Sequence, residues 1–310
     1  MRPRSAGAPS LWWDLTIPAT DDTSEGLTNF LWELGALGVV EEATPGPRAR
    51  LRAFFAGTAE PDDLAARVAG YVEGLAALGF TPGGSPTIAP LHDEGWAEAW
   101  REYFRPVPVG RRLVVVPPWN ATATDGRQAI VIEPGRAFGT GHHGSTAGCL
   151  VAVEKIVDGD RPPRAIDLGT GSGVLAIAAA RLGVESTLAV DDDPDAVAAA
   201  IANAARNGVC DRVRCVLGDA GTLETPAAPL VLANLLAAAH HRLAPRYATL
   251  VSRGGALVLG GILDGEAHAV AEAVGRAGFT LDHTVSLEGW TTVVLRRADT
   301  ATDAAIHVRA

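Results

Sequence analysis

Three alternate glycines stand between an apolar run and an alanine-rich segment, and this arrangement constrains the fold more than any other feature of the chain. The run covers residues 165–168, and the glycines are Gly169, Gly171 and Gly173. Glycine tolerates positive φ and has no Cβ to keep a ligand away. A helix beginning near Val174 would direct its free N–H groups toward the loop. The sequence therefore predicts a strand, loop and helix whose backbone contacts a ligand.

A carboxylate follows at the end of the next expected strand. Residues 188–190 are apolar and end in Asp191, about twenty residues past the loop, where a carboxylate can accept both hydroxyls of a ribose. A dinucleotide fingerprint, Gly-x-Gly-x-x-Gly, would need a glycine at Val174, and the spacing here is Gly-x-Gly-x-Gly instead. The pattern predicts a nucleoside-cofactor site. A tight turn without a ligand is the alternative interpretation.

The same loop, preceded by Asp167, resembles the first motif of class I methyltransferases, which bind S-adenosylmethionine. The resemblance implies that Asp167 helps to hold the loop and the cationic amino-acid end of the cofactor, and that Asp191 holds the ribose. Asp219 would lie at the end of the third strand, where related methyltransferases place an acid on the adenine amino group.

The composition indicates a globular chain of about two domains. Of the 310 residues, 47% are apolar, and there is no uninterrupted apolar run of about eighteen residues that would span a bilayer. The first ten residues contain two arginines but no apolar segment typical of a signal peptide. We therefore expect a cytoplasmic location and no contact with a membrane.

Charge and cysteine content indicate the kind of partner. The formal net charge of −10 disfavours a broad nucleic-acid surface and favours a basic protein as partner. Cys149, Cys210 and Cys215 show neither C-x-x-C pairing nor the spacing of a disulfide scaffold. We expect them to be small buried or half-buried thiols, and no metal site is predicted.

The hydrophobic periodicity predicts a small α+β domain at residues 11–90, after a loose start at residues 1–10. Strands are expected at residues 12–18, 38–42, 51–55 and 87–89, and helices at residues 25–37 and 62–78. The first strand ends at Pro18, which is typical of an edge strand. This element order is typical of a ferredoxin-like unit.

A linker helix and a connecting strand are expected at residues 91–125. Trp96, Trp100 and Phe104 share one helical stripe there. The stripe fits either a hinge helix packed between domains or a surface that faces a substrate.

A second domain is expected at residues 126–297, before a loose tail at residues 298–310, and strands and helices alternate in it from residue 165 onward. The last two expected strands, at residues 280–287 and 291–295, follow one another without a helix. A βαβ series with a final hairpin predicts an α/β fold with a Rossmann-like sheet, mostly parallel and with one antiparallel strand.

The segment at residues 133–146, Glu-Pro-Gly-Arg-Ala-Phe-Gly-Thr-Gly-His-His-Gly-Ser-Thr, resembles the signature of the ribosomal protein L11 methyltransferase family, PrmA. The Ala-Asn-Leu-Leu run at residues 233–236 is similar to the family's Ala-Asn-Leu or Ala-Asn-Ile after the fourth strand. The resemblance covers nearly the whole chain and implies a small N-terminal domain that recognises the substrate. Two positions depart from the pattern, since Ser145 replaces a threonine and Gly144 replaces an acid or proline.

The resemblance implies methyl transfer from S-adenosylmethionine to lysine side chains, to the N-terminal amine, or to both, of ribosomal protein L11. It places Thr140 and Gly141 over the methionine end of the cofactor, with Phe138 packed on it. His142 and His143 are interpreted as loop residues with no catalytic or metal-binding role.

Asn234 is the candidate catalytic residue. A lysine amine is protonated at neutral pH, and a methyl acceptor has to be neutral. The side-chain carbonyl of Asn234 can accept an N–H of the target amine and so help it to shed its proton. A cap on the helix expected near Leu236 is the alternative role, because asparagine is a favoured N-cap.

Three other functions remain open at this stage. Base-modifying methyltransferases commonly show Asn-Pro-Pro-aromatic after the fourth strand, and this chain has no ring at residues 235–237, which disfavours nucleic acid as substrate. A lysine methyltransferase of another protein, such as an electron-transfer flavoprotein subunit, fits the same motifs. An inactive cofactor-binding assembly factor also fits them.

Overall fold

The structure is a computed structural model that describes residues 11–36, 38–43, 48–56, 59–81, 83–92, 105–122, 124–134 and 144–299. The chain divides into two compact units, one of residues 1–105 with 134–136 and one of residues 106–133 with 137–310. This division falls inside the segment predicted as a connection, residues 91–125. The predicted helix with Trp96, Trp100 and Phe104 lies outside the described residues.

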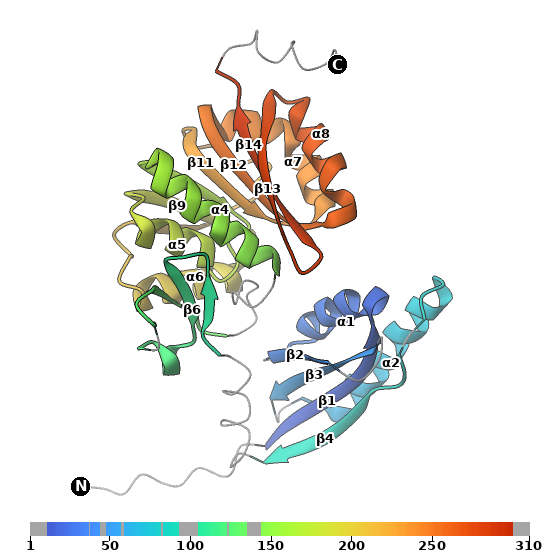
Figure 1. Cartoon of the computed structure of the whole chain (residues 1–310). Helices are drawn as coiled ribbons and strands as arrows, with labels where there is room; N and C mark the ends of the chain where they lie inside the picture. Colours follow the sequence, from blue (N-terminus) through green and yellow to red (C-terminus); the bar gives the residue numbers. More distant parts are fainter. Residues whose placement is uncertain are drawn as a thin grey trace, which may run out of the picture. The chain divides into compact units, whose positions relative to one another are not determined.

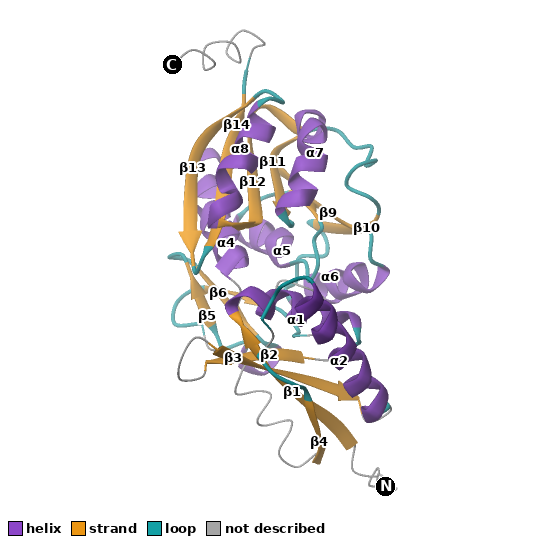
Figure 2. Cartoon of the chain, turned by 90° about the vertical axis from the view of Figure 1, so that its right-hand side faces the viewer, coloured by secondary structure: helices purple, strands orange, loops and turns teal. Residues whose placement is uncertain are grey.

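The first unit is an antiparallel sheet with two helices (Figure 1). Its elements are β1 (Leu11–Thr20), α1 (Asp21–Glu33), β2 (Gly38–Ala43), β3 (Arg48–Ala56), α2 (Pro61–Ala77) and β4 (Thr87–His92). The strand order is β2-β3-β1-β4. Alternate residues of β1, namely Leu15, Ile17 and Ala19, are buried in one cluster with residues of α1 and α2. Both helices therefore cover the same face (Figure 2), as a ferredoxin-like unit requires.

The prediction that the first strand is an edge strand is wrong. β1 is central, with β3 on one side and β4 on the other. The pairing of β1 with β4 ends at Thr16, so β4 does not extend beside Pro18. Proline has no N–H to donate, and it is therefore tolerated where a strand is paired on one side. Pro18 thus marks the end of the pairing between β1 and β4. The local sequence does not show that both β3 and β4 pair with β1.

The first helix begins earlier than the periodicity predicts. α1 starts at Asp21 instead of residue 25, because the Thr23 hydroxyl accepts from the Thr20 backbone N–H at 3.0 Å and closes the first turn. The helix ends at Glu33, before Gly35 in the left-handed region.

The second unit carries two sheets. The smaller sheet contains β5 (Val107–Val109), β6 (Leu113–Val116) and β7 (Gln128–Val131), and a short 3-10 turn, η1 (Pro118–Asn120), follows β6. The larger sheet and its helices are β8 (Arg164–Leu168), β9 (Ser186–Asp191), β10 (Val213–Leu217), β11 (Ala228–Asn234), β12 (Val251–Leu263), β13 (Phe279–Leu287) and β14 (Trp290–Arg297), with α4 (Gly144–Asp160), α5 (Val174–Leu182), α6 (Pro194–Arg206), α7 (Ala237–Leu250), η2 (Asp264–Glu266) and α8 (Ala267–Gly275).

The larger sheet has the strand order β10-β9-β8-β11-β12-β14-β13. β14 runs antiparallel to both of its neighbours, and the strands from β10 to β12 are parallel. The predicted fold class, a mostly parallel Rossmann-like sheet with one antiparallel strand, is confirmed. The strand order reverses between β8 and β11, and ligands of such sheets bind beyond the carboxyl ends of the strands at this point.

Helices cover both faces of this sheet (Figure 1). Along β11, Leu230 and Leu232 are buried with residues of α4 and α5, whereas Val231 and Ala233 are buried with residues of α7 and α8. A strand buried on both faces needs a continuous apolar run, and residues 230–233 supply one. No helix in the described part of the chain is both long and apolar enough to cross a membrane.

Candidate functional site

The glycine loop lies at the carboxyl end of β8 and leads directly into α5. Gly169, Gly171 and Gly173 all adopt positive φ, at 66°, 54° and 83°, and Gly173 is the N-cap of α5. A Cβ on Gly169 would collide with the Leu235 side chain, which belongs to the turn after β11. The loop therefore needs glycine for its backbone conformation and for its close contact with the β11 turn.

Asp167 lies beneath this loop. Its side chain is buried, and Oδ2 accepts from the Thr170 hydroxyl at 2.6 Å and from the Ala176 backbone N–H at 3.1 Å. Burial raises the pKa of Asp167 to about 6, against the two hydrogen bonds, which lower it. Oδ1 is buried and has no hydrogen-bond partner among the described residues. Such an oxygen fits a donor or a cation brought by a ligand.

Asp191 ends β9 and is hydrogen bonded to the glycine loop. Its Oδ2 accepts from the Gly171 backbone N–H at 2.8 Å, and its Oδ1 accepts from the Asp193 backbone N–H at 3.1 Å. Asp193 in turn caps α6. The half-buried carboxylate of Asp191 is therefore held in place by backbone donors while it remains open to solvent on one side.

Asp219 follows β10 at the same edge of the sheet. The Gly218 backbone N–H donates to the Asp191 carbonyl at 2.8 Å, which places the two aspartates on adjacent strand ends. Asp219 is exposed, and its Oδ1 accepts from the Gly221 backbone N–H at 2.6 Å.

Asn234 ends β11, beside β8 in the sheet. Its Nδ2 donates to the Thr146 hydroxyl at 3.2 Å, and its Oδ1 is buried without a hydrogen-bond partner in the described part of the chain. The N-cap of α7 is Leu236, and no side chain caps this helix. The alternative role of Asn234 as the helix cap is therefore wrong, because the turn places the cap two residues later.

Three of the predicted cofactor residues, Phe138, Thr140 and Gly141, lie outside the described residues, as do His142 and His143. Their proposed roles stay predictions. The structure adds Thr146, which the sequence analysis quoted only as part of a motif. Its hydroxyl accepts from Asn234 Nδ2, and the signal for it was a hydroxyl residue at the end of that motif.

The departure at Gly144 has a structural explanation. A Cβ at this first residue of α4 would lie 2.7 Å from the Leu287 carbonyl and 3.2 Å from the Glu288 Cβ, in the turn between β13 and β14. An acid or proline there would force that turn away from the helix.

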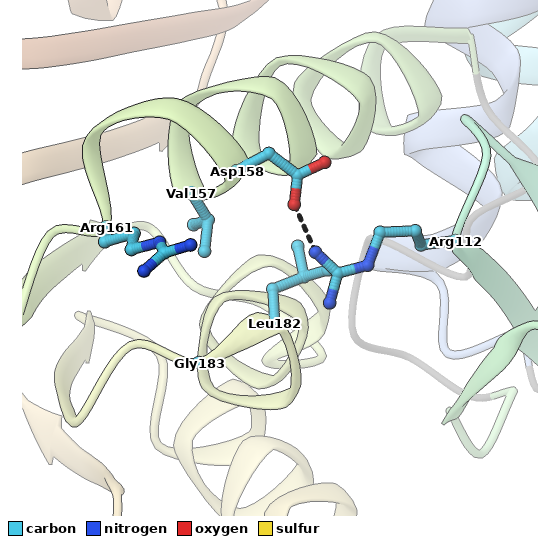
Figure 3. Close-up of a pocket in the computed structure, with 6 residues that line it drawn as sticks. All are labelled: Arg112, Val157, Asp158, Arg161, Leu182 and Gly183. Atoms are coloured by element: carbon cyan, nitrogen blue, oxygen red, sulfur yellow. Dashed lines mark hydrogen bonds and ion pairs between the residues drawn. The ribbon is translucent and has the colours of Figure 1, made fainter.

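A separate hollow lies at the opposite edge of the larger sheet (Figure 3). It has a volume of about 290 Å³, and it is lined by Arg112, Val157, Asp158, Arg161, Leu182 and Gly183. Arg112 and Asp158 form an ion pair across it. Because Arg161 and Gly183 precede β8 and β9, this hollow lies near the amino ends of the strands and is distinct from the glycine-loop site.

Comparisons with known proteins identify the family of the chain. A sequence model described as "Ribosomal protein L11 methyltransferase (PrmA)" matches residues 11–298. A ribosomal protein L11 methyltransferase of Geobacter sulfurreducens is 40% identical over 257 residues, which cover 80% of this chain and 82% of the relative. One from Pelobacter propionicus is 36% identical and covers 93% of this chain and 98% of the relative.

The solved structures agree as well. The crystal structure of a ribosomal protein L11 methylase from Lactobacillus delbrueckii subsp. bulgaricus matches with a TM-score of 0.58 and 27% identity, over 63% of this chain and 100% of that chain. The chain therefore belongs to the ribosomal protein L11 methyltransferase (PrmA) family.

Proposed function

We propose that this chain transfers methyl groups from S-adenosylmethionine to amines of ribosomal protein L11, on lysine side chains, at the N-terminus, or at both. The observation that carries the proposal is the grouping of the glycine loop, Asp167, Asp191 and Asn234 at one edge of the sheet in a chain of this family. The printed names of the relatives support the choice of substrate.

The described residues fit the cofactor. The three glycines leave room for close approach to the backbone of the loop. The unpartnered Oδ1 of Asp167 suits the cationic amino-acid end, and Asp191 retains acceptor capacity for ribose hydroxyls. In the proposal Asp219, which follows the neighbouring strand, accepts from the adenine amino group. Phe138, Thr140 and Gly141 complete the proposed set.

S-adenosylmethionine supplies an electrophilic methyl group on a sulfonium sulfur. The residues of the site would have to align a neutral amine with that methyl group and keep water away from it. The buried Oδ1 of Asn234 can accept an N–H from that amine. Thr146 holds the other end of the same amide, which fixes the direction of the oxygen.

The charge of the protein supports a basic partner. A net charge of −10 attracts a cationic protein and repels nucleic acid at long range. In the proposal the ferredoxin-like unit recognises the substrate, as the family resemblance implies.

The test is transfer of labelled methyl groups from S-adenosylmethionine to isolated ribosomal protein L11, followed by mass mapping of the modified amines. We expect Asn234→Ala to lower kcat by about 10- to 100-fold with little change in cofactor affinity, because a hydrogen bond to a charged or developing group is worth about 1.5–3 kcal/mol. Asp191→Ala should weaken S-adenosylhomocysteine binding by a similar factor in calorimetry.

The neighbouring exposed carboxylate provides the control. Asp192→Ala changes the net charge by the same amount as Asp191→Ala but leaves the hydrogen bond between Gly171 and Asp191 intact. S-adenosylhomocysteine binding and methyl transfer should therefore match those of the wild type. A wild-type protein that binds S-adenosylhomocysteine but leaves L11 unlabelled would refute the choice of substrate. Equal loss of binding in the Asp191 and Asp192 variants would refute the role of Asp191.

A further inference from the structure

A buried histidine of α7 has no part in the proposed chemistry, yet it is fully hydrogen bonded. His240 is 0% exposed. Its Nδ1 lies 2.8 Å from the hydroxyl of Tyr247, which is seven residues, or about two turns, further along α7. Its Nε2 lies 2.8 Å from the Gly260 carbonyl of β12. His240 belongs to none of the sequence motifs described above.

The partners determine the protonation of the ring. A backbone carbonyl can only accept, so Nε2 carries the hydrogen and donates to Gly260. Nδ1 is then the acceptor, and the Tyr247 hydroxyl donates to it. Burial lowers the pKa of His240 to about 4, which keeps the ring neutral at physiological pH. Tyr247 thus fixes the tautomer that Gly260 requires.

Gly260 connects this histidine to the candidate catalytic turn. In the parallel ladder of β11 and β12, Gly260 is the direct neighbour of Asn234. The Gly260 carbonyl, which accepts from His240, also accepts from the Leu235 backbone N–H at 3.1 Å. A Cβ on Gly260 would lie 2.8 Å from Asn234 Oδ1, so the Asn234 amide rests directly against this glycine.

The next residue, Gly261, packs closely against the backbone of Leu235 in the same turn. Gly261 has a positive φ of 73°, and a Cβ there would collide with the Leu235 carbonyl. The ladder of β12 with β14 shifts register between Leu259 and Ile262, which covers both glycines. The Gly260–Gly261 backbone therefore leaves regular pairing with β14 where it receives the β11 turn.

We propose that His240 is a positioning residue, which fixes the Asn234–Leu235 turn through the Gly260 carbonyl and so directs the Asn234 oxygen at the methyl-accepting amine. This inference rests on the proposed function of Asn234. It assigns the ring no proton transfer, because both of its nitrogens are occupied by protein groups.

The first test is a double-mutant cycle on kcat with His240→Leu and Asn234→Ala. If the ring acts through Asn234, His240→Leu should lower kcat by about tenfold in the wild-type background, which equals about 1.4 kcal/mol, and by less than about twofold in the Asn234→Ala background. Equal effects in both backgrounds would overturn the inference. The KM for S-adenosylmethionine should change less than kcat, because His240 reaches the glycine loop through Leu235, which lies against Gly169.

Matched variants separate positioning from packing. His241 is the exposed neighbour on the same helix, so His241→Leu should leave kcat unchanged. His240→Gln keeps an N–H donor for the Gly260 carbonyl and should restore part of the rate lost in His240→Leu. Tyr247→Phe keeps nearly all of the volume and removes only the donor that fixes the tautomer, so it should lower kcat in the same direction even where His240→Leu is too unstable to assay.

A readout without catalysis makes the inference independent of the substrate. Amide hydrogen exchange at Leu235, followed in the full chain without cofactor, should accelerate in His240→Leu and Tyr247→Phe but not in His241→Leu. Unchanged exchange at Leu235 would overturn the positioning role. If the wild-type protein fails to methylate L11 while Leu235 exchange responds as expected, the proposed substrate fails and the positioning contact stands.

Discussion

Replacing Asp167 by asparagine should make the protein more stable relative to wild type as the pH rises from about 4 to about 6, in the absence of cofactor. Burial raises the pKa of Asp167 from 3.8 to about 6. Between these values the folded protein keeps a proton that the unfolded chain has lost. The favourable contribution of Asp167 is therefore complete below pH 3.8 and is lost as the pH rises through 6.

The size of the effect follows from the shift. One pKa unit corresponds to about 1.36 kcal/mol, so a shift of about two units is worth about 3 kcal/mol. Asparagine has the same shape and does not ionise, so its contribution does not change with pH. The difference in unfolding free energy, Asp167→Asn minus wild type, should increase by about 3 kcal/mol between pH 4 and pH 7. Urea unfolding at a series of pH values measures this difference.

His240 provides a control of opposite sign. Burial lowers its pKa from 6.5 to about 4, so its contribution is complete above pH 6.5 and is lost as the pH falls through 4. The difference for His240→Gln minus wild type should therefore decrease by about 3 kcal/mol as the pH rises over this range. A difference for Asp167→Asn that is flat, or that slopes in the same direction as that for His240→Gln, would refute the reasoning.

Two glycine substitutions test the close contacts around the site. Gly169→Ala should weaken S-adenosylhomocysteine binding by about tenfold or more in calorimetry and cost about 1–3 kcal/mol of stability, because a side chain at positive φ would collide with Leu235. Gly144→Ala should cost about 1–3 kcal/mol in urea unfolding, because its Cβ would lie 2.7 Å from the Leu287 carbonyl. Gly159→Ala, in the same helix with open space around it, is the control for both and should not destabilise the protein. Destabilisation by the Gly159 variant equal to that by the Gly144 variant would contradict the contact argument.

Local patterns in the sequence predicted the parts of the site that lie close together along the chain. The glycine loop follows its own strand directly, and Asp191 ends the next strand, so an apolar run followed by a polar residue was enough to find both. Asn234, at the end of β11, was found through the resemblance of the Ala-Asn-Leu-Leu run to the family motif. The carboxyl ends of parallel strands meet at one edge, which is why separate local signals led to one site.

Contacts between distant residues carried no local signal. The partner of Asn234 is Thr146, 88 positions away, and the partner of His240 is a glycine carbonyl on another strand. The central place of β1 depends on β4, which pairs with it after two helices and two further strands. Every residue has a backbone carbonyl, so the residue type of an acceptor such as Gly260 does not reveal that its carbonyl is hydrogen bonded. The role of Gly260 could therefore be seen only in the structure.

Asn203 of α6 and Asn207, the C-cap of that helix, make such distant contacts with the glycine loop and with β7. Asn203 is buried, and its Nδ2 donates to the Ser172 carbonyl inside the glycine loop at 2.9 Å while its Oδ1 accepts from the Glu133 backbone N–H at 3.1 Å. Asn207, one turn later, exchanges two hydrogen bonds with the backbone of Val131, at 2.8 and 2.7 Å, as a further strand would.

Asn203 joins the glycine loop to Glu133, the first residue of the motif at residues 133–146, and Asn207 binds Val131 just before it. In the sequence they look like two polar residues on an alanine-rich helix. Because each buried amide uses both its donor and its acceptor, replacing either asparagine with an apolar residue would leave backbone groups of the loop or of β7 unpaired. The glycine loop and the start of the motif at residues 133–146 are therefore held together by a side chain that belongs to neither segment.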